Sequence, residues 1–368
     1  MIRLAAVINT FAADFLTQYR DQLTADHTRA LAAMQHCRTQ ASPKLQVQCT
    51  GCAQQRLVPH SCGHRHCPHC QHHESQQWLE RQLRKQVPAA YFMLTFTLPA
   101  EFRALAWAHQ NVLYDLLLRC SWETVRTFSQ NDQQLQGTPG AIAVLHTNTR
   151  QLDYHPHVHL VMPAAALDGA HQQWRTKRRS TGKGIYLFNE RALAKVFRAK
   201  LLAGIAAAGL ALPRRYPPAW VVHCKSVGTG EKALIYLGRY LYRGVIREHD
   251  IVACHDGQVC FRYRNAKTGK MEQRTVAGAQ FLWLVLQHVL PKGFRRARNF
   301  GFLHPNRKHL IALLHVLLKF DPGRAAAWIK ERPAIRCPGC GAVMTIVRTR
   351  IPPSLAGAMV PLAVEGAR

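Results

Sequence analysis

The sequence contains few acidic residues. Of its 368 residues only 20 are Asp or Glu, against 49 that are Lys or Arg, so the formal net charge at pH 7 is +29. Such a charge is typical of proteins that bind a polyanion, and nucleic acid is the first candidate. The same shortage disfavours an active site built from several carboxylates. Hydrophobic residues make up 48% of the chain, which argues against disorder, and the length predicts two or three domains.

Long apolar runs are also absent, and their absence indicates the cellular compartment that we expect. The longest run, Leu201–Leu212, is interrupted by Gly204 and Gly209 and is shorter than the roughly 18 residues that a membrane span needs. At the N-terminus a short apolar stretch is soon followed by Asp14, which is unlike a secretion signal. We therefore expect a cytoplasmic protein without a membrane partner. Disulfides are rare there, so the 12 cysteines require another explanation.

A nucleotide-binding loop is missing as well. The string closest to a P-loop, GTGEKA at 228–233, lacks the required spacing and the Ser or Thr after its Lys. This counts against a protein that carries its own ATP-driven helicase.

The cysteines form Cys-x2-Cys pairs, a spacing typical of zinc ligands. Cys49 and Cys52 are followed, after 14 residues, by Cys67 and Cys70, and two such pairs can complete one tetrahedral site. Twelve cysteines placed at random would form about 0.4 pairs at this spacing, whereas the chain has three. We therefore predict a structural zinc ion in a small module, bound by Cys49, Cys52, Cys67 and Cys70.

Further potential ligands surround these four, and spacing does not choose among them. They are Cys37, Cys62, His64 and His66 near the first two pairs, and Cys337 and Cys340 close to the C-terminus. The first group can substitute for the preferred ligands or build a second site. The last pair is half of a site whose partner is not evident, so a metal and a structural role are equally open.

Three histidines alternate in a strand-like run, HPHVHLVM at 155–162. Side chains of a strand alternate between its faces, so His155, His157 and His159 should point the same way. Two imidazoles on one face can bind one divalent metal. The preceding run AIAVLHT at 141–147 predicts a hairpin with a long loop. A surface strand with histidines of no function is the competing interpretation.

A helix predicted over 231–243 carries a pair of tyrosines, Tyr236 and Tyr240. Residues four apart lie on one helical face, so both hydroxyls can approach one point. Arg239 and Arg243 add positive charge beside them, and Gly238 permits close approach of a backbone. An amphipathic helix that merely packs two aromatic rings is the alternative.

Together the two motifs suit a transesterification. A tyrosine with an ordinary pKa of about 10 is a poor nucleophile at pH 7, so it needs a metal that polarises the phosphate. The tyrosine would attack phosphorus, a 5′-phosphotyrosine would form, and a 3′-hydroxyl would leave. Two tyrosines permit two covalent links at once, which suits strand exchange more than hydrolysis.

In their order along the chain, these motifs resemble those of the rolling-circle HUH transposases of the insertion sequence 91 type, in the two-tyrosine group. The resemblance runs through most of the chain and rests on SCGHRHCPHCQ, YFMLTFTLP, LHT followed by HPHVHLVMP, YLGRYLYR and HVLPKGFRRARNFG. It implies an α+β fold. A small N-terminal zinc-binding domain would precede an HUH endonuclease domain with a central antiparallel sheet flanked by helices, and a basic C-terminal extension would follow.

The resemblance also implies roles for individual residues. His157 and His159 would be metal ligands, and Tyr236 and Tyr240 would be the nucleophiles. The implied activity is nicking and joining of single-stranded DNA at element ends with Mg²⁺ or Mn²⁺, beside the structural Zn²⁺. The implied partners are DNA, mainly single-stranded element ends and targets, and host replication factors, in the nucleoid of a bacterium.

The third ligand of the catalytic metal is not given by the motif. His146 would lie beside His157 if the hairpin turned near 151–152, and Asp153 is the other candidate.

A basic segment near the C-terminus predicts a DNA-binding surface. Residues 292–308 contain six Lys or Arg and no acid, with three phenylalanines between them. Cations follow phosphates and rings stack on bases in single-strand binding. The residues expected to contact DNA are Lys292, Arg295, Arg296 and Arg298, together with Arg239 and Arg243 of the tyrosine helix.

These motifs divide the chain into three expected domains. They are a helical, zinc-binding DNA-recognition domain at 1–85, the HUH tyrosine endonuclease at 86–275, and a basic region with a Cys-x2-Cys knuckle at 276–368. A replication initiator or relaxase with the same chemistry is an alternative function. A non-catalytic, zinc-dependent DNA-binding regulator is another, but it leaves HPHVH and YLGRY without a role.

Overall fold

The computed structural model describes residues 1–70, 72–178, 186–242, 244–323 and 334–352. The chain forms two compact units. The first, called here the cysteine unit, comprises Met1–His73, Ile246–Val289 and Lys330–Arg368; the second, the sheet unit, comprises Glu74–Val245 and Leu290–Ile329. In the described ranges no helix is both long and apolar enough to cross a membrane.

Three helices pack together in the cysteine unit: α1 (Leu4–Tyr19), α2 (Ala25–Gln35) and α8 (Gly278–Leu286). α2 begins at a capping box, in which the Thr24 side chain accepts from the His27 amide and His27 Nδ1 accepts from the Thr24 amide. α1 approaches α8 closely because residue 278 is glycine. A Cβ at Gly278 would lie 2.3 Å from the ring of Phe11.

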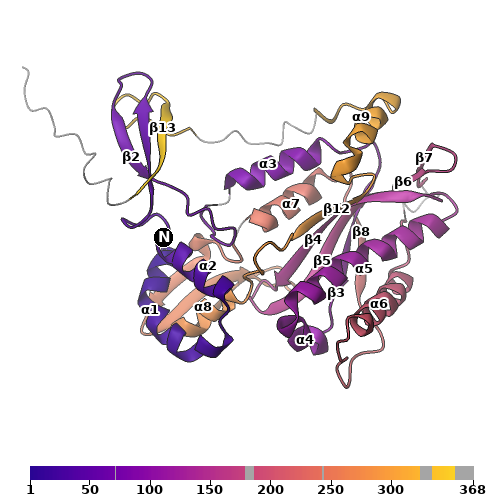
Figure 1. Ribbon diagram of the computed structural model, residues 1–368, viewed down its shortest axis with the longest axis horizontal. Coiled ribbons are helices and arrows are strands. Elements are labelled where there is room, and N and C mark those ends of the chain that lie inside the picture. Colours follow the sequence, from indigo (N-terminus) through magenta and orange to yellow (C-terminus); the bar gives the residue numbers. More distant parts are fainter. Residues whose placement is uncertain (71, 179–185, 243, 324–333, 353–368) are drawn as a thin grey trace, which may run out of the picture. The chain divides into compact units, whose positions relative to one another are not determined.

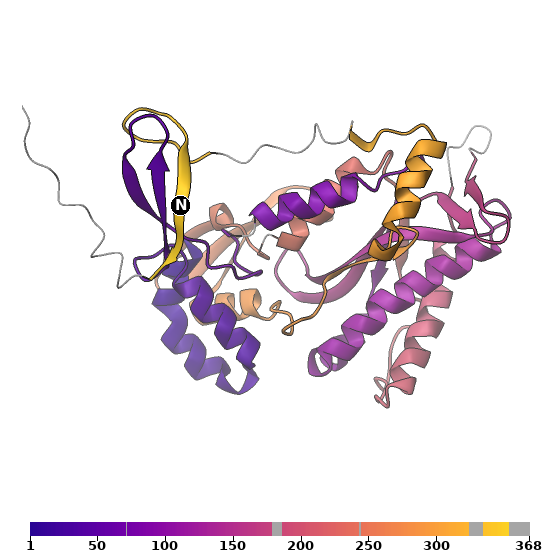
Figure 2. The same ribbon diagram turned by 45° about the horizontal axis from the view of Figure 1, so that its top comes forward.

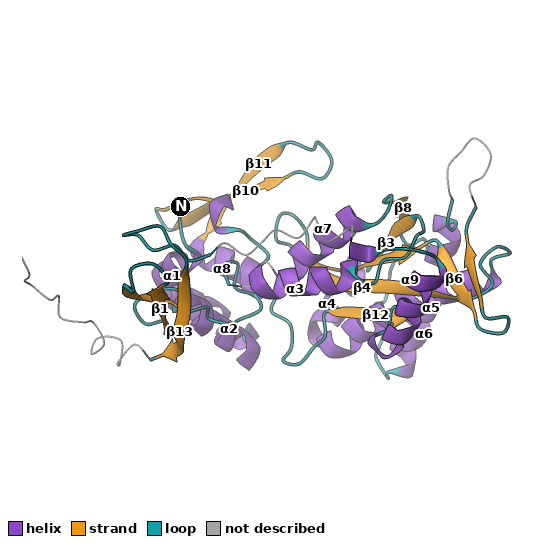
Figure 3. Ribbon diagram, turned by 90° about the horizontal axis from the view of Figure 1, so that it is seen from above, coloured by secondary structure: helices purple, strands orange, loops and turns teal. Residues whose placement is uncertain are grey.

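A three-stranded sheet in the same unit has the order β11-β10-β9. Its strands are β9 (Ile251–His255), β10 (Gln258–Arg264) and β11 (Met271–Ala277). Asp256 and Gly257 join the first two strands with φ values of 50° and 72°, the left-handed conformations that a two-residue hairpin turn requires. Figure 3 shows the β10–β11 hairpin and its loop.

A second small sheet joins the two ends of the sequence. Its order is β13-β1-β2, and its strands are β1 (Lys44–Cys49), β2 (Gln55–Pro59) and β13 (Met344–Ile351). β1 pairs antiparallel with both neighbours. Figure 2 shows the C-terminal strand beside the N-terminal hairpin.

A seven-stranded sheet forms the centre of the sheet unit. Its order is β7-β6-β4-β5-β3-β8, with β12 paired to β4, and every pairing is antiparallel. The strands are β3 (Tyr91–Thr97), β4 (Thr138–Asn148), β5 (Tyr154–Pro163), β6 (Ala165–Asp168), β7 (Gln173–Thr176), β8 (Val222–Ser226) and β12 (Ala297–Gly301). The hairpin expected from the runs at 141–147 and 155–162 is β4–β5 and is confirmed.

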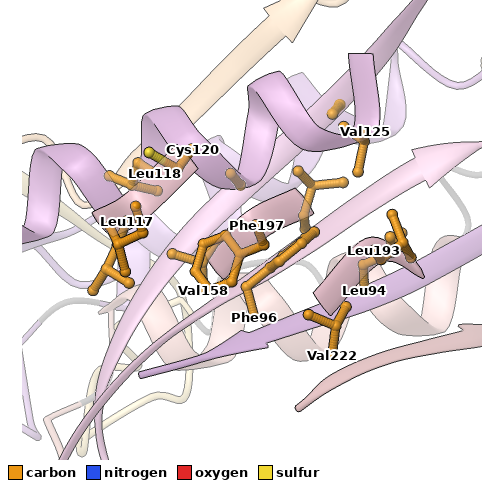
Figure 4. Close-up of a cluster of buried hydrophobic side chains, with 14 of the residues drawn as sticks. Leu94, Phe96, Leu117, Leu118, Cys120, Val125, Val158, Leu193, Phe197 and Val222 are labelled. Atoms are coloured by element: carbon orange, nitrogen blue, oxygen red, sulfur yellow. The ribbon is translucent and has the colours of Figure 1, made fainter. Parts of the chain in front are cut away.

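Helices cover both faces of this sheet (Figure 1). One face is covered by α5 (Gln110–Asn131) and α6 (Glu190–Ala207), and the other by α7 (Glu231–Tyr242). Among the described residues, the other α-helices of the unit are α3 (His72–Leu83), α4 (Arg103–Ala108) and α9 (Lys308–Leu317). Figure 4 shows the core under α5 and α6, in which Phe96, Val158 and Phe197 are fully buried. This architecture confirms the expected α+β fold with a central antiparallel sheet.

The compact units do not follow the three consecutive domains expected from the sequence. Residues 246–289, divided between the second and third expected domains, belong to the cysteine unit. The expected C-terminal region is itself split between the two units, because β12 completes the large sheet beside β4 whereas β13 pairs with β1. Backbone hydrogen bonds between strands thus draw distant segments into one unit.

Candidate metal and tyrosine site

Strand alternation decides which side chains of the central hairpin face α7. Leu145 of β4 and Val158 of β5 belong to the core under α5 and α6, whereas Val144 and Val161 belong to the core under α7. Residues two apart on a strand share a face. By this rule His146 of β4 and the three alternating histidines of β5 lie on the α7 side, and among them His146, His157 and His159 bring their ring nitrogens together.

These three histidines converge to form one potential metal site. His146 stands opposite His157 in the β4–β5 register, as expected for a turn near 151–152. One nitrogen from each ring lies within 4.8 Å of the other two. The ring centroid of His146 is 4.3 Å from that of His159 and 5.2 Å from that of His157. Their spacing suits a single divalent ion held by imidazoles.

The protonation states of these rings suit metal ligands. His157 Nδ1 donates to the carbonyl oxygen of His155 at 2.7 Å, which leaves Nε2 with its lone pair. Burial, followed by the neighbouring His159, lowers the pKa of His157 to about 3, and burial lowers that of His159 to about 4. Burial also lowers the pKa of His146 well below its ordinary value. All three imidazoles are neutral at pH 7, the form that binds a metal.

One buried nitrogen supports the same conclusion. His159 is 8% exposed, and among the described residues its Nδ1 has no hydrogen-bond partner. A buried polar atom without a hydrogen-bond partner lowers the stability of the fold unless a ligand or metal binds it. The residues present therefore fit a divalent cation.

Two neighbouring candidates stand outside this group. His155 Nδ1 accepts from the Arg103 guanidinium at 2.8 Å, although its ring lies on the same strand. The carboxylate of Asp153 accepts from the Thr149 hydroxyl at 3.2 Å in the hairpin turn. Of the two candidates for a third ligand, His146 is the one whose ring joins His157 and His159.

Tyr236 of α7 lies against the histidines. Its ring centroid is 5.8 Å from that of His159 and 6.3 Å from that of His146. The side chain is 40% exposed, so it is accessible from solvent. The side chains of Tyr240, Arg239 and Arg243 lie outside the described residues.

A pocket of about 560 Å³ opens beside Tyr236. Met93 of β3, Ser226 of β8 and Lys232 of α7 are among its lining residues. Lys232 precedes Tyr236 by four residues, so one helical face presents both side chains. Sequence analysis did not single out this lysine, although its spacing from Tyr236 was a usable signal.

The basic segment contributes one cation close to the histidines. Arg296 Nε donates to the carbonyl oxygen of Leu145 at 2.8 Å, directly before His146. After burial and the other histidines, the charge of Arg296 further lowers the pKa of both His146 and His157. Sequence analysis predicted DNA contact for this arginine but not its position beside the three histidines.

The other predicted DNA contacts differ in their surroundings. Lys292 and Arg295 are exposed. Arg298 forms an ion pair with Asp115 at 2.6 Å, so its charge is already partly compensated. Among the phenylalanines of the segment, Phe302 is buried and Phe300 stacks on Trp122 at 5.1 Å between centroids. These two rings pack within the protein.

The cysteines form two separate groups, which corrects the predicted ligand set. Cys67 and Cys70 lie with Cys37 and Cys62, whereas Cys49 and Cys52 lie with Cys337 and Cys340. The predicted tetrahedron of Cys49, Cys52, Cys67 and Cys70 is therefore wrong as a single site. β1–β13 pairing brings the C-terminal pair to the first knuckle and so provides its partner.

Two histidines near the cysteines remain outside both groups of the described residues. His66 is 8% exposed, and its ring centroid lies 5.6 Å from that of His64. Neither replaces a thiol, because each group already has four sulfurs.

Comparison with known proteins agrees with these features. A family model described as "Putative transposase" matches residues 140–309, and one described as "Transposase zinc-binding domain" of insertion sequence 91 matches residues 7–98. The first spans the histidines and Tyr236, and the second spans the N-terminal cysteines. The chain thus combines a transposase domain with a zinc-binding domain.

Curated relatives extend over most of the chain. A putative transposase, y4qJ, of Sinorhizobium fredii is 33% identical over 79% of this chain and 79% of its own length. The transposase for insertion sequence element IS801 of Pseudomonas savastanoi pv. phaseolicola is 29% identical over 80% of this chain and 76% of its own. The chain belongs to the insertion sequence 91 family of transposases.

Among solved structures, the conjugative relaxase TrwC in complex with a mutant OriT DNA is 17% identical over 65% of this chain and 74% of that chain. Its TM-score is 0.26, which is too low to establish a common fold.

Proposed function

We propose that this transposase nicks and rejoins single-stranded DNA at the ends of an insertion sequence, through a 5′-phosphotyrosine link, in rolling-circle transposition. The observation that carries the proposal is the approach of Tyr236 to His146, His157 and His159 on one face of the sheet. A tyrosine next to a potential metal site is what phosphoryl transfer by a tyrosine requires.

The histidines would hold the cation that the reaction needs. Mg²⁺ or Mn²⁺ bound by His146, His157 and His159 would polarise a phosphate oxygen and offset its charge. Hard cations prefer oxygen ligands, so phosphate and water would complete the ligand set. The buried, neutral rings supply a rigid platform, because two hairpin strands fix their positions.

Tyr236 would act as a nucleophile on the phosphate. Its Oη would form the new bond to phosphorus while the bond to the 3′ oxygen breaks. The phenol proton passes to solvent, which reaches this half-exposed side chain, and the leaving 3′ oxygen takes a proton in return. The reverse reaction, with the 3′-hydroxyl of another strand, rejoins DNA without an external energy source.

Nearby cations would hold the strand in place. Arg296 lies beside the histidines, and Lys232 lines the pocket next to Tyr236. Positive groups near the nucleophile favour the binding of a phosphate there. Tyr240 follows on the same helix and is proposed as the second nucleophile, which would let two strand ends be attached at once.

Covalent capture of DNA tests this function. The full-length protein is incubated with Mn²⁺ and labelled single-stranded oligonucleotides that carry the ends of its element. We expect an SDS-stable protein–DNA adduct and a free 3′-hydroxyl fragment. DNA binding without an adduct, with Mg²⁺ and Mn²⁺ alike, would favour the regulator instead. An adduct that forms only with a plasmid origin would favour a relaxase or replication initiator.

Salt dependence tests the predicted DNA contacts. Binding of single-stranded DNA should weaken steeply with salt, with a log–log slope of about −0.7 for each phosphate neutralised. Changing Lys292→Gln and Arg295→Gln together should reduce that slope by about 1.4 in magnitude. The measurement is fluorescence anisotropy between low and physiological salt.

The matched control changes two exposed cations of α6, a helix on the sheet face away from the histidines. Arg191→Gln with Lys195→Gln removes the same charge from α6. If the control and the test variant reduced the slope equally, the basic segment would have no special place in DNA binding.

A further inference from the structure

We propose that the protein binds two structural zinc ions, and that the second ion joins the two ends of the chain. Its ligands would be Cys49, Cys52, Cys337 and Cys340. The matched zinc-binding domain ends at residue 98, so half of this site lies outside that domain. The first ion would be held by the other group, Cys37, Cys62, Cys67 and Cys70.

The distances between sulfurs suit a tetrahedral ion. Cys49 Sγ lies 3.4 Å from Cys340 Sγ, and Cys52 Sγ lies 3.7 Å from Cys337 Sγ. A zinc–sulfur bond of about 2.3 Å gives a tetrahedral edge of about 3.8 Å, whereas a disulfide bond is about 2.05 Å long. All four sulfurs lie within 4.8 Å of one another. The spacing of the thiols thus suits a shared zinc ion and not a disulfide bond.

The backbone around Cys49 has the form of a metal-binding knuckle. The amides of Gly51 and Cys52 point to Cys49 Sγ, at 3.3 and 3.4 Å. Amide donors stabilise a thiolate, the form in which cysteine binds a metal. Gly51 also leaves room for the other knuckle, since a Cβ there would stand 3.1 Å from Cβ of Ala342 and 3.4 Å from Cys340 Sγ.

The second knuckle closes in a similar turn. Cys337 donates its amide to Ala342 and accepts at its carbonyl from Gly341, each at 2.9 Å. Gly341 has a φ of 74°, which glycine adopts without strain. Strand pairing then aligns the two turns, because Cys49 stands opposite Met344 in the β1–β13 register.

The core around this site is too small to hold the sheet by itself. The buried hydrophobic residues of the cluster are Val47, Cys49, Cys337 and Met344. Two of these four are proposed ligands, so the described residues of this cluster include only two buried side chains that are purely apolar. Small modules with so little core depend on a metal or on disulfides. A zinc ion would supply the missing free energy.

The two groups share no cysteine. In the first group Cys37 Sγ lies 3.2 Å from Cys70 Sγ and 3.6 Å from Cys67 Sγ. Eight of the 12 cysteines therefore divide into two complete sets of four thiols. The other four are Cys120, Cys224, Cys254 and Cys260.

Metal content per chain tests the proposal without any DNA reaction. The full-length protein is produced with zinc and measured by inductively coupled plasma mass spectrometry. We expect about two zinc ions per chain in the wild type and about one in Cys337→Ser with Cys340→Ser. The matched control, Cys254→Ser with Cys260→Ser, changes two cysteines of the β9–β10 hairpin and should keep two.

Hydrogen exchange reports on the same variant by a second route. Loss of the second ion should raise amide exchange in residues 44–59 and 344–351, while α1 and α2 stay protected. The proposal would be overturned by a content of one zinc ion per chain in the wild type. It would also be overturned if the Cys337/Cys340 variant kept two zinc ions, or if the wild type held iron in place of zinc. A protein that binds two zinc ions but forms no DNA adduct would leave it intact and contradict only the proposed function.

Discussion

Tyr236→Phe is expected to abolish the covalent adduct with single-stranded element ends and to slow nicking by about three orders of magnitude or more. The substitution removes the oxygen that would attack phosphorus in the first step. It leaves the ring in place, 5.8 Å from that of His159, so folding and DNA binding should not change. Single-turnover cleavage with Mn²⁺ and gel detection of the adduct provide the measurement.

Tyr216→Phe is the matched control for this experiment. Its ring packs on Phe102 at 5.1 Å between centroids, against the core under α5 and α6, on the sheet face opposite the histidines. This variant should cleave at the wild-type rate. An adduct that survives Tyr236→Phe but disappears in Tyr240→Phe would transfer the first step to Tyr240. An adduct that survives in the double variant would refute tyrosine chemistry.

Loss of a metal ligand should be nearly as severe. His157→Ala and His159→Ala should each reduce cleavage by about 10³, because the metal contributes several kcal/mol of transition-state stabilisation. Affinity for DNA measured without a divalent metal should stay close to wild type, since the histidines are neutral and add no charge for phosphates. Cleavage rates over a Mn²⁺ titration, with calorimetric metal binding, measure both effects.

His255→Ala controls for the removal of an imidazole as such. Its side chain is 72% exposed in the β9–β10 hairpin, and the variant should match wild type. If His157→Ala and His159→Ala both cleaved with unchanged Mn²⁺ dependence, the three-histidine site would have no part in catalysis.

Short-range patterns in the sequence predicted much of the sheet unit. Alternation of side chains was enough to place His157 and His159 on one face, because a strand repeats every two residues. The Tyr236 helix and the β4–β5 hairpin follow from equally short-range patterns and are confirmed. His146 could be proposed as a neighbour of His157 because a hairpin restricts its register.

Contacts between distant segments were beyond such rules. Arg296 reaches the histidines because β12 adds to the sheet beside β4, and no local pattern in either segment specifies that pairing. Arg103 donates a hydrogen bond to His155 Nδ1, although the strand pattern treats all three histidines of HPHVH alike. Side-chain partners of this kind depend on packing in three dimensions.

The cysteines show most clearly what the sequence determined and what depended on the tertiary structure. The sequence by itself determined that Cys-x2-Cys pairs exist, that they suit zinc, and that the chain is basic enough for DNA. Only the tertiary structure decided that Cys49 and Cys52 meet Cys337 and Cys340 instead of the nearer Cys67 and Cys70. The physical reason is that closing a longer loop costs little extra entropy, so the β1–β13 hydrogen bonds, and not proximity along the chain, select the partner.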